Sequence, residues 1–349
     1  MTTAKATKPR SATPRKARAP STASAGDESQ KKRVIRSLFA IRWAERNATP
    51  ARSMVVTLDD VQRAIERANK RWALSGHSGL STRNPANFFK DIVRREQSYR
   101  SAWPLSALKR GYIGMQSKGG KTVKGTPKGN GPCFEFILAT TSDPIGDLYQ
   151  RVPVYRLPEA TGEARIFGVQ TLELPVEVRR LSREDENFLL QLIVRLRVIE
   201  THLSIVSHKR LESLVHLQMG LKLRGAEIDA LFLGQMQPWQ RKLPRPSPKL
   251  SDKRRVLVAL EAKGKSDDIL KGQIEDQAIA LFRLDTFSEE IDFVVPMAAK
   301  LVGPSRIYVV EYQLIARDEI VKRRPGIAKL RLASEAFYDF SPPLRGFGD

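Results

Sequence analysis

Cysteine is almost absent from this chain of 349 residues, in which Cys133 stands alone. A single thiol excludes a disulfide framework and a thiolate metal site, and it suits a reducing compartment. The chain has only four histidines, and their spacing excludes a zinc finger. No apolar run approaches the roughly 20 residues that a membrane-spanning helix needs, so we expect no membrane partner.

Acidic residues are scarce relative to basic ones. The chain has 60 Lys and Arg against 38 Asp and Glu, which gives a formal net charge of +22. A protein of this charge attracts polyanions, and nucleic acid is the polyanion that we expect. The length allows two domains, and a hydrophobic content of 41% supports packed cores.

Residues 1–32 form a low-complexity tail whose first acidic residue is Asp27. The tail has too little apolar surface to fold. Its Arg- and Ser-rich start is similar to an organellar transit peptide, but three prolines interrupt any amphipathic helix. We therefore favour a tail that tethers the protein to DNA, with a disordered tail without function as the alternative. We expect a cytoplasmic protein of prokaryotic or phage origin.

Residues 33–140 are predicted to form a DNA-binding domain. Thr57 and Asp60 make a capping-box start for one helix, and Asn84 and Pro85 start a second. Two such helices joined by a short link are typical of a helix-turn-helix. The outward residues of the second helix, which we expect to contact DNA, are Arg83, Asn87, Lys90, Arg94 and Arg95.

A basic, glycine-rich segment, 116–131, follows between two predicted strands, 108–115 and 133–139. It lacks the glycine spacing and the following helix of a nucleotide-binding P-loop. We favour a basic wing that contacts the DNA backbone, with a plain solvated hairpin as the alternative. Its DNA-binding candidates are Lys118, Lys121 and Lys124. Helix and wing together resemble a winged-helix domain.

A Pro-punctuated connector, residues 141–180, is predicted to lead to a second domain, residues 181–349. The second domain is predicted to begin with two amphipathic helices, 183–206 and 208–220, because apolar residues recur there at helical spacing. The first of these helices contains Glu200 and the second contains Glu212.

The strongest chemical signal is a pair of short apolar segments, 225–234 and 255–264, each predicted to be a strand. The second strand ends in Glu261 and Lys263, which share one face, and the first carries Asp229. Burying such charges is costly unless they are paired or bind a metal, so the strand ends indicate a site. Two carboxylates with a nearby lysine form the hard-oxygen pocket that Mg²⁺ prefers.

An Asp on one strand followed by Glu-x-Lys on the next resembles the PD-(D/E)xK nuclease superfamily, and within it the type II restriction endonucleases. Here the pattern is Asp229 and then Glu261-Ala262-Lys263, with Ile228 in place of the usual proline. A helix from Ser266, with Asp267 and Asp268 in its first turn, and two further apolar strands, 291–297 and 306–312, complete the superfamily order. The resemblance covers about residues 180–320.

The resemblance implies a role for each matching residue. Asp229 and Glu261, with the backbone carbonyl of Ala262, would hold Mg²⁺, for which Mn²⁺ could substitute. Lys263 would orient or deprotonate the attacking water. On the following helix, Gln273 or Gln277 would support that water or a phosphate.

The superfamily often adds a glutamate from a helix that precedes the Asp strand. The two candidates are Glu212 and Glu200, and Glu212 is favoured because its predicted helix adjoins the strand of Asp229. A surface role is the alternative for both.

The sequence thus predicts an α/β (α+β) protein, with a restriction-endonuclease-like core of a mixed sheet flanked by helices after a winged-helix domain. The expected function is Mg²⁺-dependent endonucleolytic cleavage of double-stranded DNA, of the sequence-specific type II kind. A homodimer is expected, because cutting both strands usually needs two sites, and a cognate DNA methyltransferase is a further implied partner. A non-catalytic DNA-binding regulator and a structure-specific repair or recombination nuclease remain as alternatives.

Overall fold

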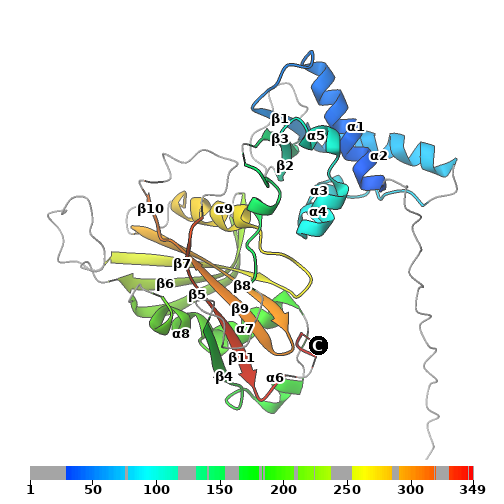
Figure 1. Cartoon of the computed structure of the whole chain (residues 1–349). Coiled ribbons are helices and arrows are strands. Elements are labelled where there is room, and N and C mark those ends of the chain that lie inside the picture. The colour runs from blue at the N-terminus through cyan, green and yellow to red at the C-terminus, as the bar shows by residue number, and fades with distance from the viewer. Residues whose placement is uncertain are drawn as a thin grey trace, which may run out of the picture.

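The structure of the chain is a computed structural model of two modules (Figure 1). Among the described residues, the N-terminal module (residues 29–149) has one hydrophobic core, and the sheet module (residues 165–348) has three clusters of buried apolar residues. None of the helices in the described part of the chain is long and apolar enough to cross a membrane. The described residues are 29–74, 78–116, 131–139, 141–153, 165–180, 183, 185–207, 211–223, 225–236, 254–284, 291–317, 319, 330–344 and 346–348.

The N-terminal module packs helices against a small antiparallel sheet of strand order β1-β3-β2. Thr57 and Asp60 form the predicted capping box at the start of the second helix. Phe89 stacks on Phe134 with ring centroids 4.4 Å apart, which locks the third helix onto the sheet. The elements are α1 (Gln30–Glu45), β1 (Ser53–Thr57), α2 (Leu58–Ala73), α3 (Pro85–Val93), α4 (Glu96–Ala102), α5 (Leu105–Leu108), β2 (Tyr112–Gln116) and β3 (Pro132–Leu138).

The sheet module confirms the mixed α/β architecture. Within the described residues, eight strands form one sheet of order β4-β11-β9-β8-β7-β6-β5, with β10 paired to β8. The pairs β7–β8 and β11–β4 are parallel and the others are antiparallel. Its elements, which follow the short helix η1 (Gly146–Leu148), are β4 (Arg165–Gln170), α6 (Val176–Arg180), α7 (Glu186–Arg195), α8 (Val198–Ile205), β5 (Leu211–Leu223), β6 (Ala226–Met236), β7 (Arg254–Lys263), α9 (Lys271–Phe282), β8 (Phe293–Gly303), β9 (Arg306–Tyr312), β10 (Ile315–Ala316) and β11 (Leu332–Ser341).

Helices cover both faces of this sheet: α7 and α8 lie on one side and α9 on the other (Figure 1). Alternate residues of β7 therefore enter different cores, with Val258 and Leu260 toward α7 and α8, and Leu257 and Ala259 toward α9. Burial on both faces explains the continuous apolar run in the sequence of this strand. The predicted order of strand, strand, helix, strand, strand is confirmed by β6, β7, α9, β8 and β9.

The predicted helix over residues 208–220 is wrong, because residues 211–223 form strand β5. From Val215 to Leu223 every second residue is apolar, which is the period of a strand. Pairing with β6 stabilises the strand conformation of this segment over a helix. Two other helices have corrected bounds. The helix predicted over 183–206 breaks between α7 and α8, where Arg197 adopts a left-handed φ of 51°. The helix predicted from Ser266 begins instead at Lys271.

The segment predicted as a connector, residues 141–180, contains regular structure. Its strand β4 forms one edge of the large sheet through parallel pairing with β11.

Candidate active site

Adjacent strands bring Asp229 and Glu261 together. The last paired position of β6 and β7 is Ala230 with Leu260, so the two carboxylates lie one residue beyond it on opposite strands. The backbone N–H of Ala262 donates to Asp229 Oδ2 at 2.7 Å. Glu261 is only 4% exposed and Asp229 is half-buried. The site is therefore built into the sheet at the ends of two strands.

Lys263 and Gln277 hold the Glu261 carboxylate from two sides. Lys263 Nζ donates to Glu261 Oε1 at 2.5 Å. Gln277, buried on α9, donates its amide N–H to the other Glu261 oxygen and to the backbone carbonyl of Glu227, the latter at 2.7 Å. Gln277 thus positions a carboxylate, whereas Gln273, one turn earlier on α9, lines the adjacent pocket.

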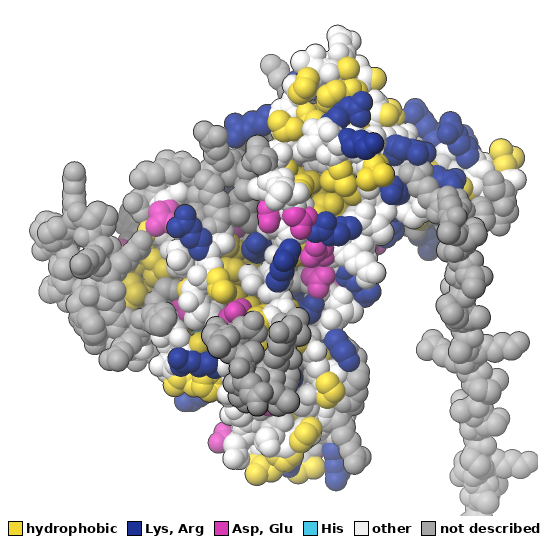
Figure 2. Space-filling model, viewed as in Figure 1, with side chains coloured by type: hydrophobic (Ala, Val, Ile, Leu, Met, Phe, Trp, Pro, Cys, Tyr) yellow, Lys and Arg dark blue, Asp and Glu magenta, His cyan; other side chains and the backbone are white. Residues whose placement is uncertain are grey.

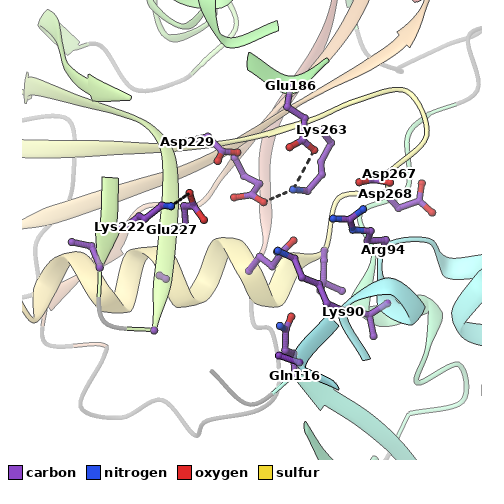
Figure 3. Close-up of a pocket in the computed structure, with 18 of the residues that line it drawn as sticks. Lys90, Arg94, Gln116, Glu186, Lys222, Glu227, Asp229, Lys263, Asp267 and Asp268 are labelled. Carbon is purple, nitrogen blue, oxygen red and sulfur yellow. Dashed lines mark hydrogen bonds and ion pairs between the residues drawn. The ribbon is translucent and has the colours of Figure 1, made fainter. Parts of the chain in front are cut away.

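Glu186 joins this site, although the sequence pattern did not single it out. It is the first residue of α7, where Asp185 caps the helix by accepting from the Phe188 N–H at 2.7 Å. Glu186 Oε1 lies 3.9 Å from Lys263 Nζ, and Figure 3 shows Glu186, Asp229 and Lys263 pointing toward one another. The available signal was the run of three acidic residues, 184–186, before an apolar run, which marks a helix start but says nothing about its spatial neighbours.

The two glutamates proposed for this role belong to elements whose backbone lies away from Asp229. Glu200 lies on α8 near His216, and burial raises the pKa of its carboxyl group. Glu212 belongs to the end of β5 where Leu211 pairs with Met236, at the far end of β6 from Asp229. The side chain of Glu212 lies outside the described residues.

The charges of the site are unbalanced. Burial, and next the charge of Glu261, raise the pKa of Asp229 to about 7. Burial acts to lower the pKa of Lys263, but Glu261 and Glu186 outweigh it and the pKa of Lys263 is raised, so its ammonium form is stabilised. Three carboxylates therefore share one lysine. This excess of negative charge favours binding of a cation.

A Mg²⁺ ion fits this donor set. Among the described residues, no group of three or more His, Cys, Asp or Glu side chains has metal-binding geometry. Mg²⁺ does not require such a cage, because it commonly takes one or two carboxylates and completes its shell with waters and phosphate oxygens. The neighbouring carboxylates of Asp229 and Glu261, whose repulsion a cation would relieve, meet that requirement.

A pocket of about 820 Å³ opens between the two modules at this site. Asp229 and Lys263 lie on its sheet side, and Lys90 of α3 and Arg94, just after α3, lie on the opposite side (Figure 3). Glu261 also lines the pocket. Lys and Arg side chains gather over the N-terminal module, and acidic side chains lie where it meets the sheet module (Figure 2). The pocket thus joins a basic helix to an acidic site.

All five residues predicted to face outward from the second DNA-binding helix are exposed: Arg83, Asn87, Lys90, Arg94 and Arg95. Arg95 also lies 4.0 Å from Asp267 of the sheet module. Lys118, Lys121 and Lys124 of the predicted wing lie outside the described residues.

The loop that follows Lys263 fixes the basic helix to the site. The N–H of Asp268 donates to the carbonyl of Arg94 at 2.9 Å, and its carboxylate accepts from the Glu96 N–H at 3.0 Å and from Lys300 Nζ at 2.7 Å. Asp268 makes these bonds from the loop before α9, and not from the first turn of a helix as predicted. They connect the end of α3 to the end of β7 through five residues of chain.

Chemically, the arrangement can hold a divalent cation beside a phosphate that Lys90 or Arg94 contacts, with the Lys263 ammonium as a further donor. No protein-family model, curated protein or solved structure matched this chain.

Proposed function

We propose that this protein is a Mg²⁺-dependent endonuclease of the PD-(D/E)xK type that hydrolyses phosphodiester bonds in double-stranded DNA. The observation that carries the proposal is the meeting of Asp229 with Glu261, Ala262 and Lys263 at the ends of adjacent strands, with Gln277 fixing Glu261 from the following helix. The strand and helix order of the sheet module supports the same assignment.

Each residue of the site has a role in this reaction. Mg²⁺, when bound, supplies charge stabilisation at the scissile phosphate and makes a bound water more acidic. Asp229, Glu261 and the carbonyl of Ala262 would hold the ion. Because the pKa of Lys263 is raised, its ammonium donates hydrogen bonds, so we assign it to orienting the attacking water and the phosphate. Gln277 keeps Glu261 aimed at the ion.

The N-terminal module would deliver the DNA. Its order α1-β1-α2-α3-α4-α5-β2-β3, in which three strands of order β1-β3-β2 accompany the helices, supports a winged-helix assignment. Lys90 and Arg94 face the carboxylates across the pocket, which supports a path for the DNA backbone between the two modules.

Replacing Lys90 and Arg94 together by alanine is expected to weaken DNA binding. If each side chain contacts one phosphate, the slope of log affinity against log salt falls by about one for each replacement. Fluorescence anisotropy of labelled duplex DNA without metal, at several salt concentrations, measures this slope. Lys109→Ala, which removes one exposed lysine outside the pocket, is the control, and an unchanged slope in the double variant would contradict the assignment.

Replacing Glu186 by glutamine is expected to lower the cleavage rate about 10- to 100-fold, as loss of a group that supports metal ligands does. The charge near Lys263 and Asp229 decreases, so the Mg²⁺ concentration for half-maximal rate should rise. Titration of initial rates with Mg²⁺ measures both effects. Glu177→Gln, an exposed glutamate in the first turn of α6, is the matched control and should leave the titration unchanged.

The proposed function is tested by incubating phage-length duplex DNA with Mg²⁺ and sequencing the ends. We expect wild-type protein to produce 5′-phosphate and 3′-hydroxyl ends, and Asp229→Ala and Lys263→Ala to cut at least about 10³-fold more slowly. Equal activity in all three proteins would overturn the site. Fixed fragments indicate a restriction enzyme, whereas smears or cuts at branches indicate a repair or recombination nuclease. Salt-dependent binding without cleavage in Mg²⁺ or Mn²⁺ would indicate a regulator.

A further inference from the structure

Strand β5 forms one edge of the large sheet and is long for an edge strand. It spans 13 residues, against 6 for β4 at the opposite edge. Among the described residues, β6 is its one strand partner, so its other side presents backbone N–H and C=O groups that can pair with a further strand. β5 is therefore a surface that can extend the sheet.

The centre of β5 lacks the charged residues and the prolines that often protect an edge. Residues 213–221 contain no Asp, Glu, Lys, Arg or Pro, and none of the described side chains of β5 is buried. Val215 is 56% exposed and Leu217 is 41% exposed, and Ile205 at the end of the neighbouring helix α8 is 50% exposed. A register shift between His216 and Gln218 leaves Leu217 opposite no residue of β6, so a bulge is the protective feature that this edge carries. Natural proteins rarely leave so long an uncharged edge open to solvent.

We propose that β5 pairs antiparallel with β5 of a second copy of this chain. Antiparallel pairing of identical strands is self-complementary about a two-fold axis, so one surface serves both partners. The charge distribution of the protein also favours contact through the uncharged centre of β5, residues 213–221. A net charge of +22 makes two copies repel over most of their surfaces, and the uncharged centre of β5 is where close approach costs least. The same lack of charge makes this strip unsuited to nucleic acid.

The pairing has a consequence that rests on the proposed function. The two-fold axis of an antiparallel strand pair is perpendicular to the sheet, so both sites lie on one face of a continuous sheet. Asp229 lies on β6 between the partners of Met219 and Leu221. For a pair centred on Leu217, strand rise and spacing place the two Asp229 positions about 25 Å apart. One duplex can span that distance, which corresponds to about seven base-pair steps.

The mass of the full-length protein in solution, measured by sedimentation without DNA or Mg²⁺, tests the pairing. We expect wild-type protein to have twice the 39.3 kDa of one chain. Val215→Lys and Leu217→Lys place a charge on the edge without emptying a core, and each is expected to weaken self-association at least about 100-fold, because a lysine opposes edge pairing and the two-fold axis brings the two introduced charges close together. Ile166→Lys, on the opposite edge strand β4 and 40% exposed in the wild type, is the matched control and should remain a dimer.

Wild-type protein that stays at the mass of one chain over the whole concentration range would overturn the pairing. So would a dimer that both β5 variants retain while circular dichroism shows them folded. The mass measurement does not depend on cleavage, so it stands even if the protein proves inactive on DNA. If the nuclease is also confirmed, the β5 variants should nick one strand of supercoiled plasmid and lose concerted double-strand cuts, which supports the pairing.

Discussion

Replacing Lys263 by alanine is expected to reduce Mg²⁺-dependent cleavage of duplex DNA by about 10³-fold, within the range for a positioned proton-transfer or charge-stabilising group. The Lys263 side chain is 12% exposed and lies 2.5 Å from Glu261 and 3.9 Å from Glu186. Without its ammonium, the carboxylates of the site lose the cation that offsets their repulsion toward a phosphate. The water also loses a donor that orients it. Initial cleavage rates at saturating Mg²⁺ measure the loss.

Lys265→Ala is the matched control for this replacement. Lys265 lies two residues further along the chain and donates to the backbone carbonyl of Gly348 at 2.9 Å, so its loss removes the same charge without touching the carboxylates. We expect its cleavage rate to stay within about threefold of wild type, the effect of an ordinary surface change. A Lys263→Ala protein that binds DNA and cuts it as fast as the Lys265→Ala protein would remove Lys263 from the mechanism.

The core of the fold and half of the site follow from local sequence. The apolar run of β7 identifies a strand buried on both faces, and strand alternation alone places Glu261 and Lys263 on one face. The position of Asp229 beside them is also predictable, because β6 is the strand that precedes β7 in the chain and pairs with it. Each of these features depends on residues of one strand or of two consecutive strands, so a local pattern is enough to predict it.

The remaining features depend on tertiary contacts that no local pattern specifies. Leu211, Leu214 and Val215 are spaced as on a helix, and only pairing with β6 makes the segment a strand. Glu186 reaches the site because α7 packs across the end of β7, and its sequence signal identifies a helix start and nothing more. Asp268, expected in the first turn of a helix, instead bonds to the backbone of the other module. Contacts between modules leave no periodicity in a sequence.

Replacing Asp229 by asparagine is expected to stabilise the metal-free protein while it abolishes cleavage. Burial and the charge of Glu261 raise the pKa of Asp229 from 3.8 to about 7, so folding opposes ionisation of this carboxyl group. A raised carboxyl pKa costs no stability at low pH. The cost appears as pH rises above the unfolded value and is complete above the folded value, where it reaches up to about 4 kcal/mol. Asparagine cannot ionise, and its carbonyl oxygen can still accept from the Ala262 N–H.

Thermal melts of the two proteins with a chelator should therefore diverge as pH rises. Near about pH 8 we expect Asp229→Asn to melt about 5 °C above wild type, corresponding to about 2 kcal/mol, and near about pH 4 the two should coincide. Adding Mg²⁺ should reverse the order, because an ion that binds only the folded wild type stabilises it in proportion to the logarithm of its concentration. Asp91→Asn, an exposed aspartate on α3, controls for loss of one negative charge. Melting of Asp229→Asn below wild type at every pH without metal would show that the Asp229 carboxylate stabilises the folded protein. The proposal that Asp229 is an ion ligand whose ionised form destabilises the metal-free protein would then be wrong.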